Sequence, residues 1–191
     1  MKYKLTNSQR NFSVANSEYY SALWNHGGIV FFNEAYTYDE LNTAFNNLIK
    51  SFESLRMCFK NDKTDYSLFL KRHEFKKYPF FCFKADDEII EASYKLTNSS
   101  LNLEDELITC IIFNTPNKSG YIFCIHHVII DGFSTQVMGE YLNNYLKNNQ
   151  EHFDKRKSAI YKNTPNFSIF GVGDYSFRKY KVAISGFTKE P

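Results

Sequence analysis

The sequence contains no apolar run that approaches the roughly 20 residues of a membrane-spanning helix. Its first residues include no apolar segment of the kind found in secretion signals, so we expect a cytoplasmic protein without membrane contact. The 23 Lys+Arg and 21 Asp+Glu nearly cancel, which argues against nucleic acid as a partner. Internal repeats are absent too. A chain of 191 residues that is 43% hydrophobic predicts one globular core.

Cysteine is also scarce, and its spacing excludes two kinds of site. The four cysteines are Cys58, Cys82, Cys110 and Cys124, and no two of them form a Cys-x-x-Cys pair. A zinc site needs clustered ligands, and a disulfide framework needs an oxidising compartment. We therefore interpret all four as reduced, buried, small hydrophobic side chains. We expect no metal and no bound cofactor.

Helical patterns occur in three places. Thr37 to Glu40 form a capping box, and apolar residues follow at helical spacing through 52. Three acids at 86–88 open a second helix that runs to about 97, because acids are favourable at a helix N-terminus. An apolar stripe over 133–146 predicts a third helix.

Strand-like segments surround these helices. The segment 23–32 reads as a strand, 55–60 and 66–71 as a hairpin, and 107–113 and 121–125 as two more strands. This order favours an α/β sandwich around one sheet. From 151 onward the signals weaken: 152–157 is linker-like and 165–174 is loop-like. We divide the chain into a lobe over 1–150 and a linker or crossover segment over 151–191.

A pair of histidines closes the strand-like run 121–125. On a strand, neighbours point to opposite faces, so only one of His126 and His127 can face a given cleft. Asp131 can cap the following helix or pair with a buried arginine, and Gly132 permits a backbone approach that a side chain would block. A histidine at this place can act as a general base near neutral pH.

Three other interpretations fit the same residues. His127 and Asp131 could bind a metal, but their spacing requires a helix and the segment is rich in β-branched residues. A Ser134–His–Asp triad would crowd its members into one turn. The two histidines could also be ordinary residues of a half-buried strand.

Four segments in order resemble condensation domains of nonribosomal peptide synthetases, in the superfamily of chloramphenicol acetyltransferase. Residues 5–10 resemble the first half of the motif Leu-Ser/Thr-x-x-Gln-x-x-Leu-Trp, and 51–59 match Arg-His-Glu-x-Leu-Arg-Thr-x-Phe at Glu53, Leu55, Arg56 and Phe59. Residues 125–134 match Met-His-His-x-x-x-Asp-Gly-x-Ser except at the first position. Residues 172–178 echo Tyr-x-Asp-Tyr-Ser/Ala-x-Trp, with Val172 for Tyr and Arg178 for Trp.

The resemblance implies a fold and a set of roles. The fold is a two-layer sandwich of the chloramphenicol acetyltransferase type, with a mixed, largely antiparallel sheet and helices on one face. The catalytic motif is His126, His127, Asp131 and Gly132, in which His127 orients or deprotonates an acceptor amine or hydroxyl and His126 points into the fold. Arg56 is the expected structural partner of Asp131. Ser134, Asp174 and Tyr175 are candidates for the substrate tunnel.

The same resemblance implies partners and an incomplete site. The acyl donor would be carried as a thioester on the phosphopantetheine of a carrier protein, or on CoA. Such domains consist of two lobes with the tunnel between them, and we expect this chain to represent the N-terminal lobe only. A C-terminal condensation lobe, or another copy in a homo-oligomer, would then supply the opposite wall. The alternative is a non-catalytic interaction module that docks carrier or partner proteins, which the imperfect fourth motif favours.

Overall fold

The computed structural model describes residues 2–5, 9, 21–61, 66–148 and 167–172. The short 3-10 helices are η1 (Ser21–Trp24) and η2 (Glu53–Arg56), and the α-helices are α2 (Tyr38–Ser51), α3 (Asp86–Thr97) and α4 (Gly132–Asn148). The strands are β1 (Lys2–Lys4), β2 (Asn25–Phe32), β3 (Met57–Asn61), β4 (Tyr66–Leu70), β5 (Phe80–Cys82), β6 (Ile108–Asn114), β7 (Ser119–His126) and β8 (Phe167–Val172).

Two sheets form the β structure of the described chain. The larger one has the strand order β5-β6-β7-β2-β8, and the smaller one has the order β1-β4-β3. All neighbouring strands are antiparallel except β5 and β6, which are parallel. The predicted α/β class with a mixed, largely antiparallel sheet is therefore confirmed, as are the helix that follows the capping box and the hairpin of β3 and β4. The expectation of one sheet is wrong, because this hairpin pairs with β1 in a sheet of its own.

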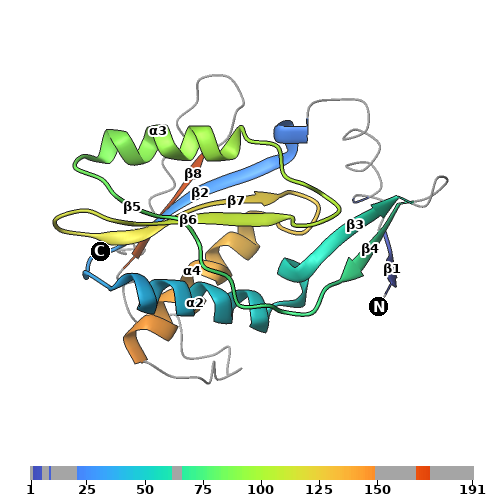
Figure 1. Cartoon of the computed structure of the whole chain (residues 1–191), viewed down its shortest axis with the longest axis horizontal. Coiled ribbons are helices and arrows are strands. Elements are labelled where there is room, and N and C mark those ends of the chain that lie inside the picture. Colours follow the sequence, from blue (N-terminus) through green and yellow to red (C-terminus); the bar gives the residue numbers. More distant parts are fainter. Residues whose placement is uncertain (1, 6–8, 10–20, 62–65, 149–166, 173–191) are drawn as a thin grey trace, which may run out of the picture.

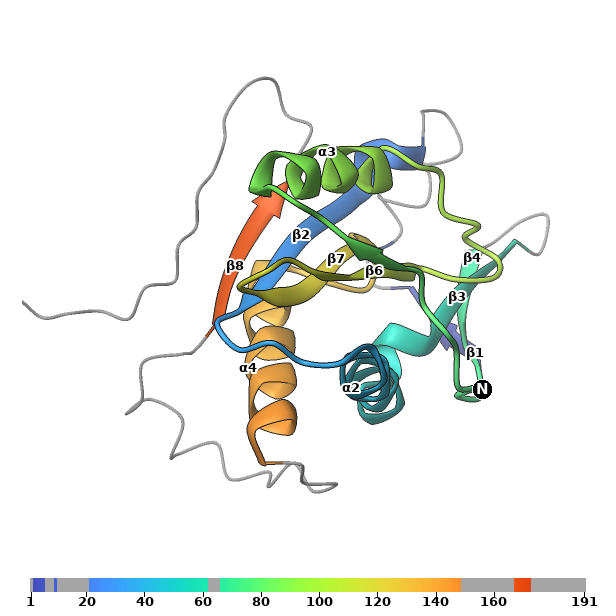
Figure 2. The ribbon, with the colours of Figure 1, turned by 60° about the vertical axis from the view of Figure 1, so that its left-hand side comes forward.

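Helices cover both faces of the larger sheet (Figures 1 and 2). Alternate residues of β2 and β7 pack with α2 and α4 on one face; they are Val30, Phe32, Tyr121 and Phe123. Ile29, Phe31 and Ile122 point the other way and pack with Ile89 of α3. The expectation of helices on one face only is thus wrong. The side chains on both faces of these central strands are apolar, so both faces need a covering layer.

Polar contacts fix the start of helix α2 and join its middle and its end to the rest of the fold. At its start, Thr37 and Glu40 form the predicted capping box. In its middle, the buried side chains of Asn42 and Asn46 both donate to the Lys76 carbonyl, at 3.1 and 2.8 Å. Near its end, Asn47 donates to the hydroxyl of Tyr145 at 3.0 Å, which ties α2 to α4.

Strand β8 corrects the sequence interpretation of the C-terminal region. Residues 167–172 pair antiparallel with β2, from Phe32↔Phe167 to Gly27↔Val172, and do not form the predicted loop. The outer edge of β2 offers a row of backbone partners, and this long-range pairing overrides the weak local signal. The boundary at 150 stays a prediction, and the linker over 152–157 lies outside the described residues.

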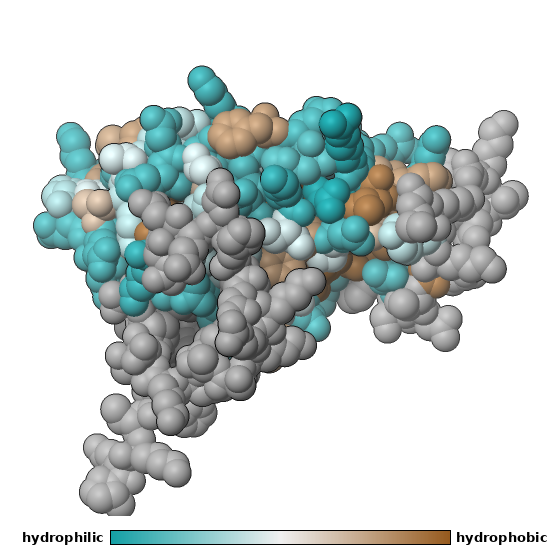
Figure 3. Space-filling model, turned by 90° about the horizontal axis from the view of Figure 1, so that it is seen from below, coloured by the Kyte–Doolittle hydropathy of each residue, from teal (hydrophilic) through white to brown (hydrophobic). Residues whose placement is uncertain are grey.

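The face that carries α2 and α4 is mainly polar (Figure 3). Seen from the side of α2 and α4, it is largely hydrophilic with separate hydrophobic patches (Figure 3). Cys58, Cys110 and Cys124 are buried as expected, whereas Cys82 is exposed because β5 is an edge strand. No helix of the described ranges is long and apolar enough to cross a membrane.

Candidate active site

The histidine pair lies where the central strand β7 ends, between its two neighbouring strands. The backbone N–H of His126 donates to the Leu107 carbonyl before β6, and that of His127 donates to the Trp24 carbonyl before β2, both at 2.8 Å. The chain then turns, with the N–H of Ile129 donating to the His126 carbonyl at 3.2 Å. Hydrogen bonds to the residues that precede both neighbouring strands therefore fix the backbone from which the two imidazoles project.

His126 points into the fold, as the family resemblance implied, and it is fully buried. Strand alternation alone had left open which of the two histidines points inward. Its Nδ1 accepts the N–H of Val128 at 3.3 Å, so the proton of the neutral ring lies on Nε2. Phe59 lies edge-on against the ring, with the centroids 6.2 Å apart. Burial, together with the charge of His127, lowers the pKa of His126 to about 4. Burial thus keeps this imidazole neutral and closed off from solvent.

His127 has the opposite environment, because its side chain is exposed at the surface of the turn. Its ring lies 6.2 Å from the ring of His26, at an interplanar angle of 75°. Of the two adjacent histidines, it is the one that a substrate can reach.

Residues of the first two family-like segments converge on the loop after His127. Leu5 and Phe59 pack with Val128 in one buried cluster. The side chain of Gln9 donates to the Val128 carbonyl at 3.0 Å. The segments that resemble separate sequence motifs therefore act together in space: they hold the histidine loop in place.

Asp131 is the N-cap of α4. Its Oδ1 accepts hydrogen bonds from the backbone N–H of Ser134 at 2.8 Å and from the Ser134 hydroxyl at 2.6 Å. These bonds lower the pKa of Asp131. Of the two roles considered from the sequence, the structure has the helix cap, because the partners of a cap lie only three residues away.

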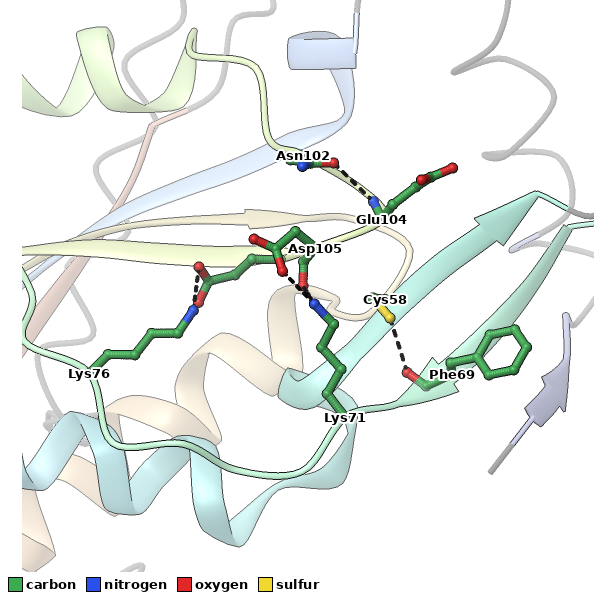
Figure 4. Close-up of polar contacts among 8 residues, drawn as sticks. Cys58, Phe69, Lys71, Lys76, Asn102, Glu104 and Asp105 are labelled. Atoms are coloured by element: carbon green, nitrogen blue, oxygen red, sulfur yellow. Dashed lines mark hydrogen bonds and ion pairs between the residues drawn. The ribbon is translucent and has the colours of Figure 1, made fainter.

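Arg56 does not pair with Asp131, and this expectation is wrong for the structure. Its Nη1 donates to the Lys71 carbonyl at 3.0 Å, and the ion pairs of the described residues include none between Arg56 and Asp131. Arg56 instead lines a cavity of about 290 Å³ together with Lys71, His73, Lys76 and Asp105. Figure 4 shows Lys71 and Lys76 reaching from the segment after β4 toward the segment before β6.

The remaining predicted residues have separate outcomes. The Ser134 hydroxyl donates its one proton to the N-cap carboxylate of Asp131 and not to a histidine, so the described structure does not form the Ser–His–Asp triad. Gly132 opens α4, and a Cβ built there has no described atom within 4 Å. Asp174 and Tyr175 lie outside the described residues. No group of three or more His, Cys, Asp or Glu residues in the described ranges is arranged to hold a metal.

Sequence reasoning missed His26, which lies in β2 opposite Ile125. Its Nε2 is 3.1 Å from the hydroxyl of Thr135 in α4. The two residues are 109 positions apart in the sequence, so no local pattern joins them. Only the pairing of β2 with β7 could have indicated the contact.

Known proteins resemble the chain both in sequence and in fold. Residues 1–163 match the family described as Condensation domain. Gramicidin S synthase 1 of Brevibacillus brevis is 28% identical over 124 residues, covering 61% of this chain and 11% of that protein. A stretch of 46 residues is 54% identical to part of the Type II methyltransferase M.NspV of Nostoc sp., covering 24% of this chain and 10% of that protein.

Among solved structures, a mutant starter condensation domain of rhizomide synthetase RzmA in complex with C8-CoA superposes with a TM-score of 0.68 at 16% identity. The alignment covers 76% of this chain and 35% of that chain, so the chain spans about a third of the length of this structure. At this identity the likeness concerns the fold. Because the family match extends over most of the sequence and the fold agrees with it, this chain belongs to the condensation domain family of nonribosomal peptide synthetases.

Proposed function

We propose that this chain provides the histidine-bearing lobe of a condensation-type acyltransferase, in which His127 acts on the acceptor nucleophile. The observation that carries the proposal is the contrast between two adjacent imidazoles. His126 is fully buried and kept neutral, whereas His127 is exposed on a backbone fixed by hydrogen bonds to both neighbouring strands. A general base needs such a reachable ring on a rigid support.

The reaction is acyl transfer from a thioester to an amine or a hydroxyl. The unprotonated ring nitrogen of His127 accepts the proton of the nucleophile as its N or O attacks the thioester carbonyl carbon. A C–N or C–O bond forms, the C–S bond breaks, and the proton passes to the departing thiolate. Such a base contributes typically 10²–10⁴-fold to the rate, and correct placement of both substrates contributes more.

The donor in this proposal is an acyl group on the phosphopantetheine of a carrier protein or on CoA. Membership in the condensation family supports the carrier, and the related rhizomide domain is known in complex with C8-CoA. No cofactor needs to remain bound, because the thioester substrate brings the activated carbonyl.

A second protein surface is also part of the proposal. His127, Asp131 and Gly132 are exposed in the described structure, and Phe133 is 69% exposed. A large apolar side chain exposed at the start of the helix that follows the histidine loop is suited to contact with a partner that excludes water from the reaction. A C-terminal condensation lobe, or another copy of this chain, would supply that surface.

The test is a transfer assay on the 191-residue chain with a separately expressed second lobe. Acyl-CoA and acylated carrier donors are offered with amine and hydroxyl acceptors, and the product is measured by mass spectrometry together with thiol release. We expect His127→Ala to lower transfer about 10²–10⁴-fold. His73→Ala is the matched control, since His73 is a partly buried histidine on the segment after β4, and we expect it to keep full transfer.

Two results would count against this function. Unchanged transfer by the His127→Ala variant would remove His127 from the chemistry. Binding of carriers by the wild-type chain without transfer to any acceptor would favour the second candidate, a non-catalytic module that docks carrier or partner proteins. The exposed Phe133 supports docking in either case.

A further inference from the structure

A third imidazole, that of His26, stands beside the histidine loop, although it lies in none of the sequence segments that resemble the family. It projects from β2 next to Trp24 and Asn25, which bind the ends of two neighbouring elements. Trp24 accepts the N–H of His127, and the Asn25 side chain donates to the carbonyls of Thr97 and Ser99 at the end of α3, both at 2.8 Å. His26 therefore sits on a firmly held part of the sheet.

The direction of its hydrogen bond follows from proton counting. The hydroxyl of Thr135 donates to the Asp131 carbonyl at 3.2 Å, and the same oxygen is 3.1 Å from Nε2 of His26. A hydroxyl has one proton and can accept further bonds. Both contacts are satisfied when His26 donates from Nε2 to Thr135. The neutral ring then carries its proton on Nε2 and leaves Nδ1 unprotonated.

The charge state of His26 agrees with this arrangement. Burial is the main cause that lowers its pKa, and the charge of His127 lowers it further. Asp131 raises it, but less. The titratable groups that act on His26 are thus His127 on the loop and Asp131 at the start of α4, and burial, the largest of the three effects, keeps His26 neutral at neutral pH.

We propose that His26 is a positioning residue of this site: its Nε2–H binds Thr135 and so fixes the 131–135 turn to β2, while its ring limits the orientations of the His127 ring. The proposal deepens the function proposed above and relies on it for its catalytic consequence. His127 lies between two points that His26 joins, since Trp24, directly before β2, accepts its backbone N–H and the 131–135 turn begins four residues after it. Loss of the contact should loosen the loop on one side and leave the sheet intact.

The contact can be tested by NMR on the full chain, without any acyl transfer. The imidazole Cε1–Hε1 signals of wild type, His127→Gln and Asp131→Asn are followed against pH. We expect the pKa of His26 to rise in His127→Gln, because a nearby positive charge is lost, and to fall in Asp131→Asn, because a nearby negative charge is lost. A His26 titration that neither variant alters would overturn the placement of this ring, whatever His127 does chemically.

The positioning role is tested by a cycle of variants in the two-lobe transfer assay. His26→Leu and Thr135→Val each remove one partner of the same hydrogen bond, and we expect each to lower kcat roughly tenfold with little change in KM. The double variant should be no worse than either single variant. His26→Gln keeps an N–H donor near the position of Nε2 without a titrating ring, so it should restore most of the lost kcat.

A merely structural His26 would behave differently. It would lower the urea midpoint of His26→Leu while kcat of the folded fraction stayed at the wild-type value, and His26→Gln would give no rescue of turnover. Either result would overturn the positioning role. If the wild-type assembly transfers nothing, the hydrogen exchange of the Thr135 amide decides instead. We expect this exchange to be faster in His26→Leu and restored in His26→Gln, and equal rates in all three proteins would refute the inference.

Discussion

The substitution Asp131→Ala distinguishes the two roles considered for this aspartate. In the structure the carboxylate accepts the N–H and the hydroxyl of Ser134 at 2.8 and 2.6 Å. Removal of an N-cap of this kind costs about 0.5–2 kcal/mol. We therefore expect the free energy of unfolding to fall by about 1 kcal/mol. Asp131→Asn, which keeps an acceptor, should lose only a fraction of this.

The comparison with Arg56 makes the prediction specific. An ion pair between Arg56 and Asp131 would give a coupling energy in a double-mutant cycle of about 0.5–3 kcal/mol. Because Arg56 binds the Lys71 carbonyl instead, the effects of Arg56→Ala and Asp131→Ala should add. Ser134→Ala is the positive control for coupling, since Ser134 contacts Asp131 directly.

Urea unfolding, followed by far-ultraviolet circular dichroism, measures each of these variants. The pKa of Asp131 is lowered in the folded state, so its contribution is present above its ordinary pKa and is lost as the pH falls through the lower, folded-state value. The difference between wild type and Asp131→Ala should accordingly shrink in acid. Asp131→Ala with unchanged stability, or a clear coupling with Arg56, would refute the cap as its role.

Two further predictions concern stability. Burial lowers the pKa of His126 from 6.5 to about 4, so the unfolded chain takes up a proton first as the pH falls, and the free energy of unfolding should drop by up to about 3 kcal/mol between pH 6.5 and 4. In His126→Asn, which keeps an acceptor for Val128, urea unfolding should show a smaller dependence of this free energy on pH. An unchanged dependence on pH would contradict the prediction. Gly28→Ala places a Cβ 2.2 Å from the Phe123 ring, and it should lower the free energy of unfolding by about 1–3 kcal/mol in thermal or urea unfolding. The Cβ of Gly132→Ala meets no described atom within 4 Å, and the free energy of unfolding of this variant should stay within about 0.5 kcal/mol of wild type. Equal losses for the two glycines would show that the packing around β2 is misread.

Local patterns predicted the elements that depend on neighbours in sequence. The capping box of Thr37 and Glu40 starts α2 where expected, because all its partners lie within one helical turn. That the side chains of His126 and His127 point to opposite sides also followed from the alternation of a strand, whereas the family resemblance indicated which of them is buried. Each of these features is decided by residues a few positions apart.

Features that depend on distant pairing were not predicted. Strand β8 owes its existence to the free edge of β2, and its own Gly-containing sequence favours a loop. The position of α3 on the opposite face depends on which set of alternating strand side chains it covers, and both sets are apolar. The residues around Asp131 allowed either a helix cap or an ion pair with an arginine. Asp131 caps α4 because Ser134 lies only three residues away, so the contact closes no long loop. Arg56 donates to the nearby carbonyl of Lys71 instead.

The neighbouring histidines show how one sequence motif combines two opposite requirements. His126 must lose its charge to be buried, and the Val128 N–H fixes its tautomer. His127 must stay accessible, yet its backbone hydrogen bond to Trp24 prevents the strand end from fraying. In the function proposed above, a base that is exposed and rigidly held would meet its substrates without reorganising. What His127 lacks in the described structure, if it acts as proposed above, is exclusion of water, and the exposed Phe133 at the start of α4 is an apolar side chain that a covering surface would bury.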